Sequence, residues 1–169
     1  MKYKIILILF VLFGAVACAE KAKKPAPVAE EIKAAVTNEQ VVVETQATRT
    51  QVSLPESVLF NSGDVQLTAE GKKTLREIAP VIEKYPDYSI LVEGHTDSKP
   101  IGAKLAKIYP TNQALSKGRA ATVERFLKNQ GKVSQSITVK GKGEMEPVGD
   151  NATAEGRVQN RRVQIILIP

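Results

Sequence analysis

The sequence has little of the chemistry that many functions require: no tryptophan, one cysteine, one histidine, four phenylalanines and four tyrosines among 169 residues. Few aromatic side chains and a mild net charge of +6 argue against nucleic acid as a partner. A single cysteine cannot form an internal disulfide. One histidine and one cysteine do not make a set of metal ligands, so we expect neither a metal nor another cofactor.

A catalytic site is not evident either. His95 precedes Thr96 and Asp97, but no Ser-His-Asp triad can be identified, because the serines lie in turns or helix starts without the glycines of a nucleophile elbow. We therefore expect His95 to be structural and the protein not to be an enzyme. The glycines at 141 and 143 lack the flanking pattern of a phosphate-binding loop and are expected to end a strand.

The N-terminus has the pattern of a targeting segment. A basic start is followed by 13 apolar or small residues from Ile5 to Ala17. A transmembrane helix needs roughly 20 such residues, whereas the apolar part of a secretory signal is shorter. Residues 1–17 are therefore predicted to be a signal peptide, and the only cysteine, Cys18, follows directly.

This junction resembles a bacterial lipoprotein signal, in which the cysteine is acylated and becomes the mature N-terminus. The resemblance implies a lipid anchor at Cys18, and Ala19 in place of aspartate implies the periplasmic face of the outer membrane. Several acyl chains would give stable anchoring. However, Ala15 stands where such signals usually carry leucine, and Ala15 with Ala17 also suits an ordinary signal peptidase. The alternative is a plain secreted protein with an unused thiol.

Residues 19–50 contain no aromatic side chain and are rich in alanine, lysine, glutamate, proline and valine. We expect residues 18–50 to be the lipidated cysteine and a flexible tether, leading to one folded domain over residues 51–169. Residues 30–36 have no evident apolar partner and are expected to form at most a transient helical turn or two. For residues 41–43, the alternative is an additional strand of the domain.

Hydrophobic periodicity predicts an α+β domain within residues 51–169. The predicted strands are 51–54, 58–60, 89–93, 137–143 and 162–168. Two helices are predicted, the first capped by Thr68 and the second by Thr111 or Asn112, and Pro80 is expected to kink or divide the first. Residues 98–111 and 144–159 are expected to be loops, with a short turn at 103–108. The expected fold is a mixed sheet of four to five strands with both helices on one face.

Two of these segments carry complementary charges, an acid after the strand 89–93 and an arginine on the second helix. The strand 89–93 leads through Gly94 to Asp97, and the second helix carries Arg119 near its start. We expect the two to face each other across a shallow cleft that suits a small zwitterion, with its carboxylate on Arg119 and its ammonium on Asp97. The alternatives are an Asp97 that caps its own turn and an Arg119 on the helix surface.

Three phrases in this order resemble the OmpA C-terminal-like domain of the OmpA/MotB peptidoglycan-associating family. The phrases are Gly94-His95-Thr96-Asp97, then Asn112, Leu115, Ser116, Arg119, Ala120 and Val123 at helical spacing, then Asn160-Arg161-Arg162-Val163. Residues 58–63 also fit the first strand and turn of that family. The resemblance covers about residues 51–169.

The resemblance implies noncovalent binding of the peptidoglycan stem peptide, mainly through its meso-diaminopimelate residue. Asp97 would hold the ammonium group of that residue, and Arg119 would hold its carboxylate. Asn112 and the backbone near Phe60 would help to line the pocket.

From the last strand, Arg161 or Arg162 would support the pocket wall, and we expect Arg161 to be the more exposed of the two. Residues 98–111 are longer than in the shorter outer-membrane lipoproteins of the family and are similar to the motor-stator version. The sequence therefore leaves the shape of the pocket rim open.

The implied function is a lipoprotein that tethers the outer membrane to the cell wall. The alternative is a peptidoglycan-anchoring subunit of an envelope machine, such as a secretion or motility assembly. Exposed ion pairs contribute only about 0–1 kcal/mol each, so binding at one site is expected to be weak. Many neighbouring ligands on one polymer compensate by raising the effective concentration. The sequence identifies no protein partner.

Overall fold

The computed structural model describes residues 27–46 and 48–169 of the chain. The predicted signal peptide (1–17), the predicted acylation of Cys18 and the first part of the predicted tether lie outside these ranges. Within them, no helix combines the length and the apolarity that crossing a bilayer requires.

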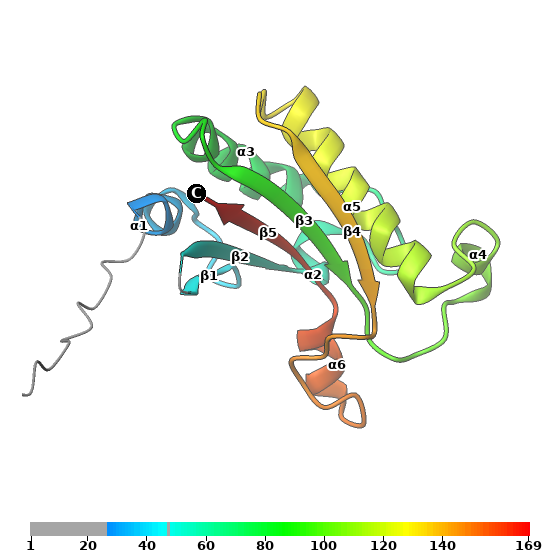
Figure 1. Cartoon of the computed structure of the whole chain (residues 1–169). Coiled ribbons are helices and arrows are strands. Elements are labelled where there is room, and N and C mark those ends of the chain that lie inside the picture. Colours follow the sequence, from blue (N-terminus) through cyan, green and yellow to red (C-terminus); the bar gives the residue numbers. More distant parts are fainter. Residues whose placement is uncertain (1–26, 47) are drawn as a thin grey trace, which may run out of the picture.

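The described chain forms one layer of strands with helices packed against it (Figure 1). The elements are, in order, α1 (Pro27–Ala35), β1 (Val42–Gln46), β2 (Arg49–Pro55), α2 (Glu56–Leu59), α3 (Ala69–Glu83), β3 (Ser89–His95), α4 (Ala103–Ala106), α5 (Asn112–Asn129), β4 (Ile137–Gly143), α6 (Ala154–Asn160) and β5 (Arg162–Ile168). The strand order in the sheet is β1-β2-β5-β3-β4, and within it only β3 and β4 run parallel. The predicted α+β class and mixed sheet are confirmed.

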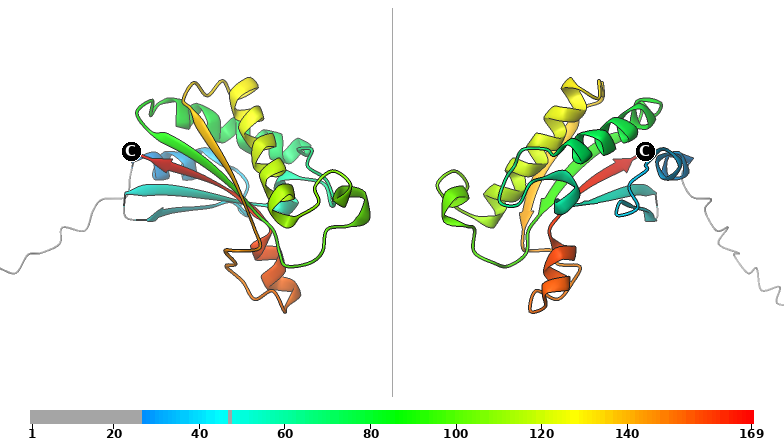
Figure 2. Two further views of the ribbon diagram at one scale, coloured as in Figure 1. Left: turned by 45° about the vertical axis from the view of Figure 1, so that its right-hand side comes forward. Right: turned by 180° about the vertical axis from the view of Figure 1, so that it is seen from behind.

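The core lies between one face of the sheet and the helices α3 and α5, which cover it side by side (Figure 2). Alternate residues of each strand point to this face, so Ile90 and Val92 of β3 and Ile165 and Leu167 of β5 are buried there. β5 pairs with β2 on one side and β3 on the other, in the sheet interior that its apolar sequence predicted.

The second half of the predicted tether is instead part of the domain. Residues 27–35 form α1, and its Val28, Ala29 and Ile32 are fully buried, with Val28 and Ile32 in the main core cluster. β1 pairs antiparallel with β2, as in the alternative considered for residues 41–43. A short charged helix gains most of its stability from packing. The apolar partner of α1 is α3, which comes some 40 residues later, so the local sequence did not reveal the contact.

Two local predictions were also wrong. Residues 58 and 59 belong to α2, although residues 58–60 were expected to be extended, and of these three only Phe60 is extended. Residues 154–160 form α6 within a predicted loop, capped by the Thr153 hydroxyl, which accepts a hydrogen bond from the Gly156 N–H at 3.0 Å. Of the two effects expected at Pro80, a kink or a division, the division does not occur, because α3 continues through this residue.

One end of the sheet gathers the segments that form the candidate site. β2 ends at Pro55, opposite Arg162 at the start of β5, and β3 ends nearby at His95. The first turns of α5 lie close to this end, because a Cβ atom at Gly94 would be only 2.0 Å from the carbonyl oxygen of Ser116. In Figure 1, α1 lies at the other end of the sheet, beside the C-terminus.

The packing of α1 can be tested with Ile32→Ala. Because Ile32 is fully buried, its truncation is expected to lower the free energy of unfolding by about 2–5 kcal/mol, measured by urea denaturation. The control is Lys33→Ala on the exposed side of the same helix, expected to change stability by less than about 0.5 kcal/mol. Equal midpoints for the two variants would mean that α1 is not part of the folded unit.

Candidate functional site

Four of the five residues predicted to bind ligand line one cavity of about 200 Å³ at this end of the sheet: Asp97, Asn112, Arg119 and Arg161. Asp97 follows β3, Asn112 and Arg119 belong to α5, and Arg161 lies between α6 and β5. The fifth residue, Phe60, lies beside the cavity, with its ring centroid 5.4 Å from the guanidinium carbon of Arg119. The fold thus brings together residues from four separate segments.

The predicted acid and arginine are joined through two further charges. The Asp97 Oδ2 atom is 2.7 Å from Arg161 Nη1, and Arg161 Nε is 2.9 Å from Glu56 Oε2. The other oxygen of Glu56, Oε1, is 2.5 Å from Arg119 Nη2. The four side chains therefore alternate in sign and sum to zero. This arrangement neutralises Arg119, whose side chain is only 5% exposed and would be costly to bury alone.

Arg119 and Thr96 keep hydrogen-bonding capacity toward the cavity. A guanidinium group has five N–H donors. Nε of Arg119 donates to the Asp64 carbonyl at 3.2 Å and Nη2 donates to Glu56, which leaves the remaining donors for a ligand. Thr96 also lines the cavity, and its hydroxyl is buried without a partner among the described residues. A polar ligand group would remove the cost of leaving that hydroxyl unpaired.

Asp97 and Asn112 also hold the rim of the cavity in place. Asp97 Oδ1 accepts a hydrogen bond from the Lys99 backbone N–H at 3.0 Å, which is the local capping role considered as the alternative. The side-chain nitrogen of Asn112 lies 3.3 Å from the Asp97 carbonyl oxygen, 3.2 Å from that of Lys99 and 2.6 Å from Glu144 Oε2. Asn112 therefore ties the segment after β3 to the start of α5.

The two arginines before the last strand have different surroundings. The Arg161 side chain is 34% exposed and lies at the cavity. Arg162 is buried, and its Nη1 and Nη2 atoms donate to the carbonyl oxygens of Asn160 and Glu146, each at 3.3 Å. Arg161 is thus the more exposed of the two, as expected from the sequence.

Glu56 is the site residue that sequence analysis missed. It was treated only as part of an interruption between two strands, whereas it begins α2, and its N–H donates to the Arg161 carbonyl at 2.9 Å. Charge balance is the signal that could have found it. Two arginines at one partly buried cavity need more than the single acid Asp97.

The segment 98–111 supplies the rim whose shape the sequence left open. It contains α4, and Pro100, Ile101 and Leu105 line the charged cavity from this side. The long loop therefore adds apolar side chains to the lining, beside the exposed Lys99. Such side chains limit the access of water and strengthen electrostatic contacts inside the cavity.

His95 has the structural environment that was expected for it. It is 2% exposed, and its Nε2 atom is 3.1 Å from Gln164 Oε1. Its side chain alternates with the core-facing residues of β3 and so lies on the other face of the sheet. Burial, with a smaller contribution from Arg162, lowers the pKa of the His95 imidazole to about 4.

Two glutamates approach His95, which the sequence analysis did not foresee because it considered only histidine and cysteine as ligands. One ligand atom from each of Glu93, His95 and Glu146 lies within 4.8 Å of the others. The Lys142 ammonium already pairs with Glu146 at 2.6 Å and Glu93 at 3.5 Å. A lysine therefore holds the place that a cation would take between these carboxylates.

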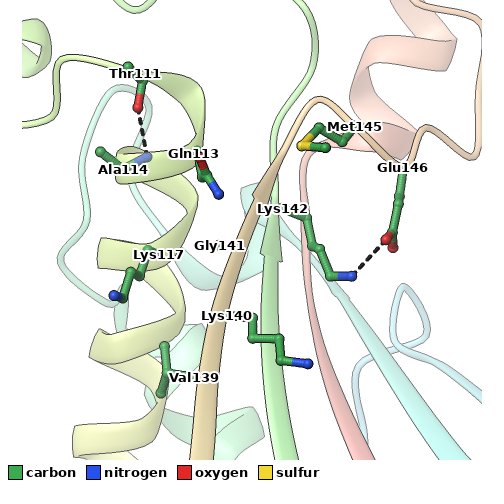
Figure 3. A pocket seen from close by; sticks show the side chains of 10 residues that line it. All are labelled: Thr111, Gln113, Ala114, Lys117, Val139, Lys140, Gly141, Lys142, Met145 and Glu146. Carbon is green, nitrogen blue, oxygen red and sulfur yellow. Dashed lines mark hydrogen bonds and ion pairs between the residues drawn. The ribbon is translucent and has the colours of Figure 1, made fainter.

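Another cavity, of about 610 Å³, lies between α5 and the edge strand β4 (Figure 3). Lys117 of α5 and Lys142 and Met145 from the end of β4 and beyond border it. None of the predicted ligand-binding residues lines this cavity. We therefore place the candidate site at the smaller cavity, where charges from four segments converge.

Comparison with known proteins gives a consistent result. The OmpA family matches residues 59–161. The chain is 37% identical to the probable lipoprotein YiaD of Escherichia coli, covering 70% of this chain and 51% of that protein. It is 34% identical to motility protein B of Bacillus subtilis, covering 70% of this chain and 44% of that protein. The chain thus spans about half the length of these relatives.

Among solved structures, the fold resembles that of the cell wall anchor of the T6SS from Pseudomonas aeruginosa. The TM-score is 0.70 at 35% identity, covering 83% of this chain and 93% of that one.

The buried histidine predicts a pH dependence of stability. Its folded-state pKa of about 4 lies below the ordinary value of 6.5, so between these values the unfolded chain binds a proton that the folded chain does not. Stability is therefore expected to decrease as the pH falls through this window, by up to about 3 kcal/mol. Urea unfolding from pH 7 to pH 4 measures the decrease.

The comparison variant is His95→Asn, which has no imidazole to titrate. Its decline with pH should be shallower than that of the wild-type chain, and the remaining slope reports the carboxylates, including Glu146 beside Lys142. An equally steep decline in both proteins would contradict the assignment to His95.

Proposed function

Because the chain belongs to the OmpA family, we propose that its folded domain binds peptidoglycan noncovalently and that the charged cavity holds the diaminopimelate of the stem peptide. The alternating charges of Asp97, Arg161, Glu56 and Arg119 around one small cavity support this proposal most directly. We propose binding without catalysis.

Charge balance favours a zwitterion as the ligand. The four paired side chains are neutral together, and Lys99, which also lines the cavity, is exposed to solvent, so a lone anion or cation would leave an uncompensated charge among the partly buried groups. The free end of diaminopimelate carries one ammonium and one carboxylate and preserves neutrality. In the proposed pose its carboxylate meets the free N–H groups of Arg119, and its ammonium lies against Asp97 and the nearby Thr96 hydroxyl.

The ligand must share these side chains with the contacts that hold the cavity together, because Glu56 already occupies part of Arg119. Affinity for one stem peptide is therefore expected to be modest. In a polymer, neighbouring stem peptides raise the effective concentration, so many weak contacts hold the wall.

The localisation proposed for the protein is the periplasmic face of the outer membrane, with a lipid anchor at Cys18. The relatives named as lipoproteins support it. In a host that makes lipoproteins, cells given labelled palmitate are expected to incorporate it into the wild-type chain and not into Cys18→Ala. Equal labelling of the two chains would contradict acylation at this residue.

A second candidate function is the wall anchor of an envelope machine. The similarity to the T6SS cell wall anchor and to motility protein B favours it. Affinity purification from detergent-solubilised membranes separates the two functions. Stoichiometric recovery of a set of membrane proteins would support the machine, and recovery of the chain alone would support the simple tether.

The proposed pocket can be tested by co-sedimentation with intact sacculi. Because Arg119 is buried and paired, its removal would also destabilise the fold, so conservative variants are preferable. Asp97→Asn removes the charge that meets the ammonium, and Arg119→Lys removes the planar fork that matches a carboxylate. Each is expected to weaken binding about tenfold or more. Lys132→Ala, exposed and away from the cavity, serves as the control.

Titration with two stem tripeptides tests the ligand itself. The tripeptide that ends in meso-diaminopimelate is expected to bind, whereas the same peptide ending in lysine lacks the second carboxylate and is expected to bind at least about tenfold more weakly.

In the sedimentation test, full sedimentation of both conservative variants would rule out the assigned pocket. Release of soluble wall fragments from the sacculi would rule out a purely binding role.

A further inference from the structure

We propose that Glu93, His95 and Glu146 form a binding site for a divalent transition-metal ion, and that the Lys142 ammonium competes with the metal for this site. Glu93 and His95 belong to β3, and Glu146 follows β4. None of these residues lines the charged cavity, so the inference does not depend on peptidoglycan binding. It departs from the expectation of no metal, which rested on histidine and cysteine alone.

The three ligand groups converge from two segments of the chain. One ligand atom from each residue lies within 4.8 Å of the other two. Side chains two residues apart on a strand point to the same face, so Glu93 and His95 project together from β3. Glu146 reaches them from the segment after β4, which pairs in parallel with β3. The Glu146 side chain is 53% exposed, so it is free to move the short distance that metal coordination at about 2.0–2.2 Å requires.

His95 has a ring nitrogen available for a metal. The Gln164 amide donates to the Ser53 hydroxyl at 3.3 Å, which turns Gln164 Oε1 toward His95 Nε2 at 3.1 Å. We therefore assign the ring N–H to Nε2, and in a neutral imidazole the other nitrogen then carries a lone pair. That nitrogen, Nδ1, is buried and has no hydrogen-bond partner in the described part of the chain. Histidines that bind metals commonly donate their second N–H to a carbonyl oxygen in this way.

Glu93 is a buried carboxylate whose partner is distant. Its side chain is only 9% exposed, and within the described ranges its one ion pair is with the Lys142 ammonium, at 3.5 Å. A charge-assisted hydrogen bond is shorter, at about 2.7–2.9 Å. A carboxylate with so little access to water is costly unless a positive charge lies close to it. A metal ion at about 2.0–2.2 Å from its oxygen would supply that charge.

Lys142 can leave the site. Its closest contact is with Glu146 at 2.6 Å, the pair drawn in Figure 3. Its side chain is 27% exposed, and its flexible stem allows the ammonium to turn into solvent, where it is strongly hydrated. The two carboxylates would then neutralise the two charges of the metal. The neighbouring Arg162 leaves both carboxylates available, because its Nη1 and Nη2 atoms donate to backbone carbonyl oxygens.

The ligand set selects the class of metal. One imidazole and two carboxylates are ligands that zinc accepts, with water in the fourth position of an open site. Calcium and magnesium prefer about six or more oxygen ligands, so a site with one nitrogen and two carboxylates should hold them weakly. A zinc ion bound here would join the segment after β4 to β3. We therefore expect a structural role for the metal.

Calorimetric titration with zinc chloride near neutral pH tests the site in the full chain, without an affinity tag and in detergent. Every protein in the series, including the parent, carries Cys18→Ala, which removes the one thiol of the sequence. The parent is expected to bind one zinc ion per chain. His95→Asn and Glu146→Gln should each weaken binding at least about tenfold, and Glu146→Gln changes an exposed side chain that is not part of the core. Calcium chloride and magnesium chloride should give no comparable binding.

Lys142→Met gives the decisive comparison. It keeps an apolar stem and removes the competing ammonium, so it is expected to strengthen zinc binding about tenfold or more. Lys140→Met is the matched control, because it removes the same charge from an exposed position of the same strand, while the ion pairs with the two glutamates involve Lys142. It should change the affinity less than about threefold. In the double variant Lys142→Met/His95→Asn the gain should disappear.

Thermal unfolding gives a second measurement. Zinc should raise the midpoint of the parent, raise that of Lys142→Met further and leave that of His95→Asn unchanged, because a ligand stabilises a folded chain in proportion to its binding. The transitions without zinc show that each variant is folded. The proposal is wrong if Lys142→Met and Lys140→Met bind zinc equally, or if Glu146→Gln binds as tightly as the parent. Absence of zinc binding to Lys142→Met would also overturn it, and none of these outcomes affects the proposed function.

Discussion

The end of the domain that carries the site depends on one electrostatic constraint: three largely buried charges, Arg119, Glu56 and Asp97, and the partly exposed Arg161 must neutralise one another. Arg119 is nearly inaccessible, and Glu56 joins it to Arg161 and, through Arg161, to Asp97. Breaking a buried pair by removing one partner is far more costly than the pair is stabilising. Three contacts hold these charges in place: the close approach of α5 at Gly94, the backbone hydrogen bond from Glu56 of α2 to Arg161 before β5, and the bonds from Asn112 of α5 to the loop after β3.

The same constraint explains what kind of ligand the cavity can accept. A neutral cluster of paired charges favours neither a simple anion nor a simple cation, but it can exchange some internal contacts for those of a molecule that brings both signs. Specificity then depends on how well the contacts of the ligand replace the internal ion pairs, and not on a net charge of the cavity. For the proposed ligand the cost would be modest affinity, which a polymer with many identical side groups would offset by repetition.

The sequence was sufficient where the signal was local. Alternation and helical spacing predicted the sheet and its two main helices, and an acid after a strand and an arginine near a helix start predicted the convergence of Asp97 and Arg119 on one cavity. It was insufficient where the stabilising partner lay far along the chain. The helix against which Ile32 is buried, α3, comes some 40 residues later, and Glu56 has no local reason to be a site residue until two arginines come near it.

The folding of α1 and β1 onto the domain bears on how far the cavity could lie from a membrane. If Cys18 is acylated, only residues 19–26 separate the lipid from α1, and eight residues extend to at most about 30 Å. α1 lies at the end of the sheet away from the cavity (Figure 1). The molecule would then be a spacer with an upper limit on its length, and the widest gap between membrane and wall would follow from chain geometry rather than from binding strength.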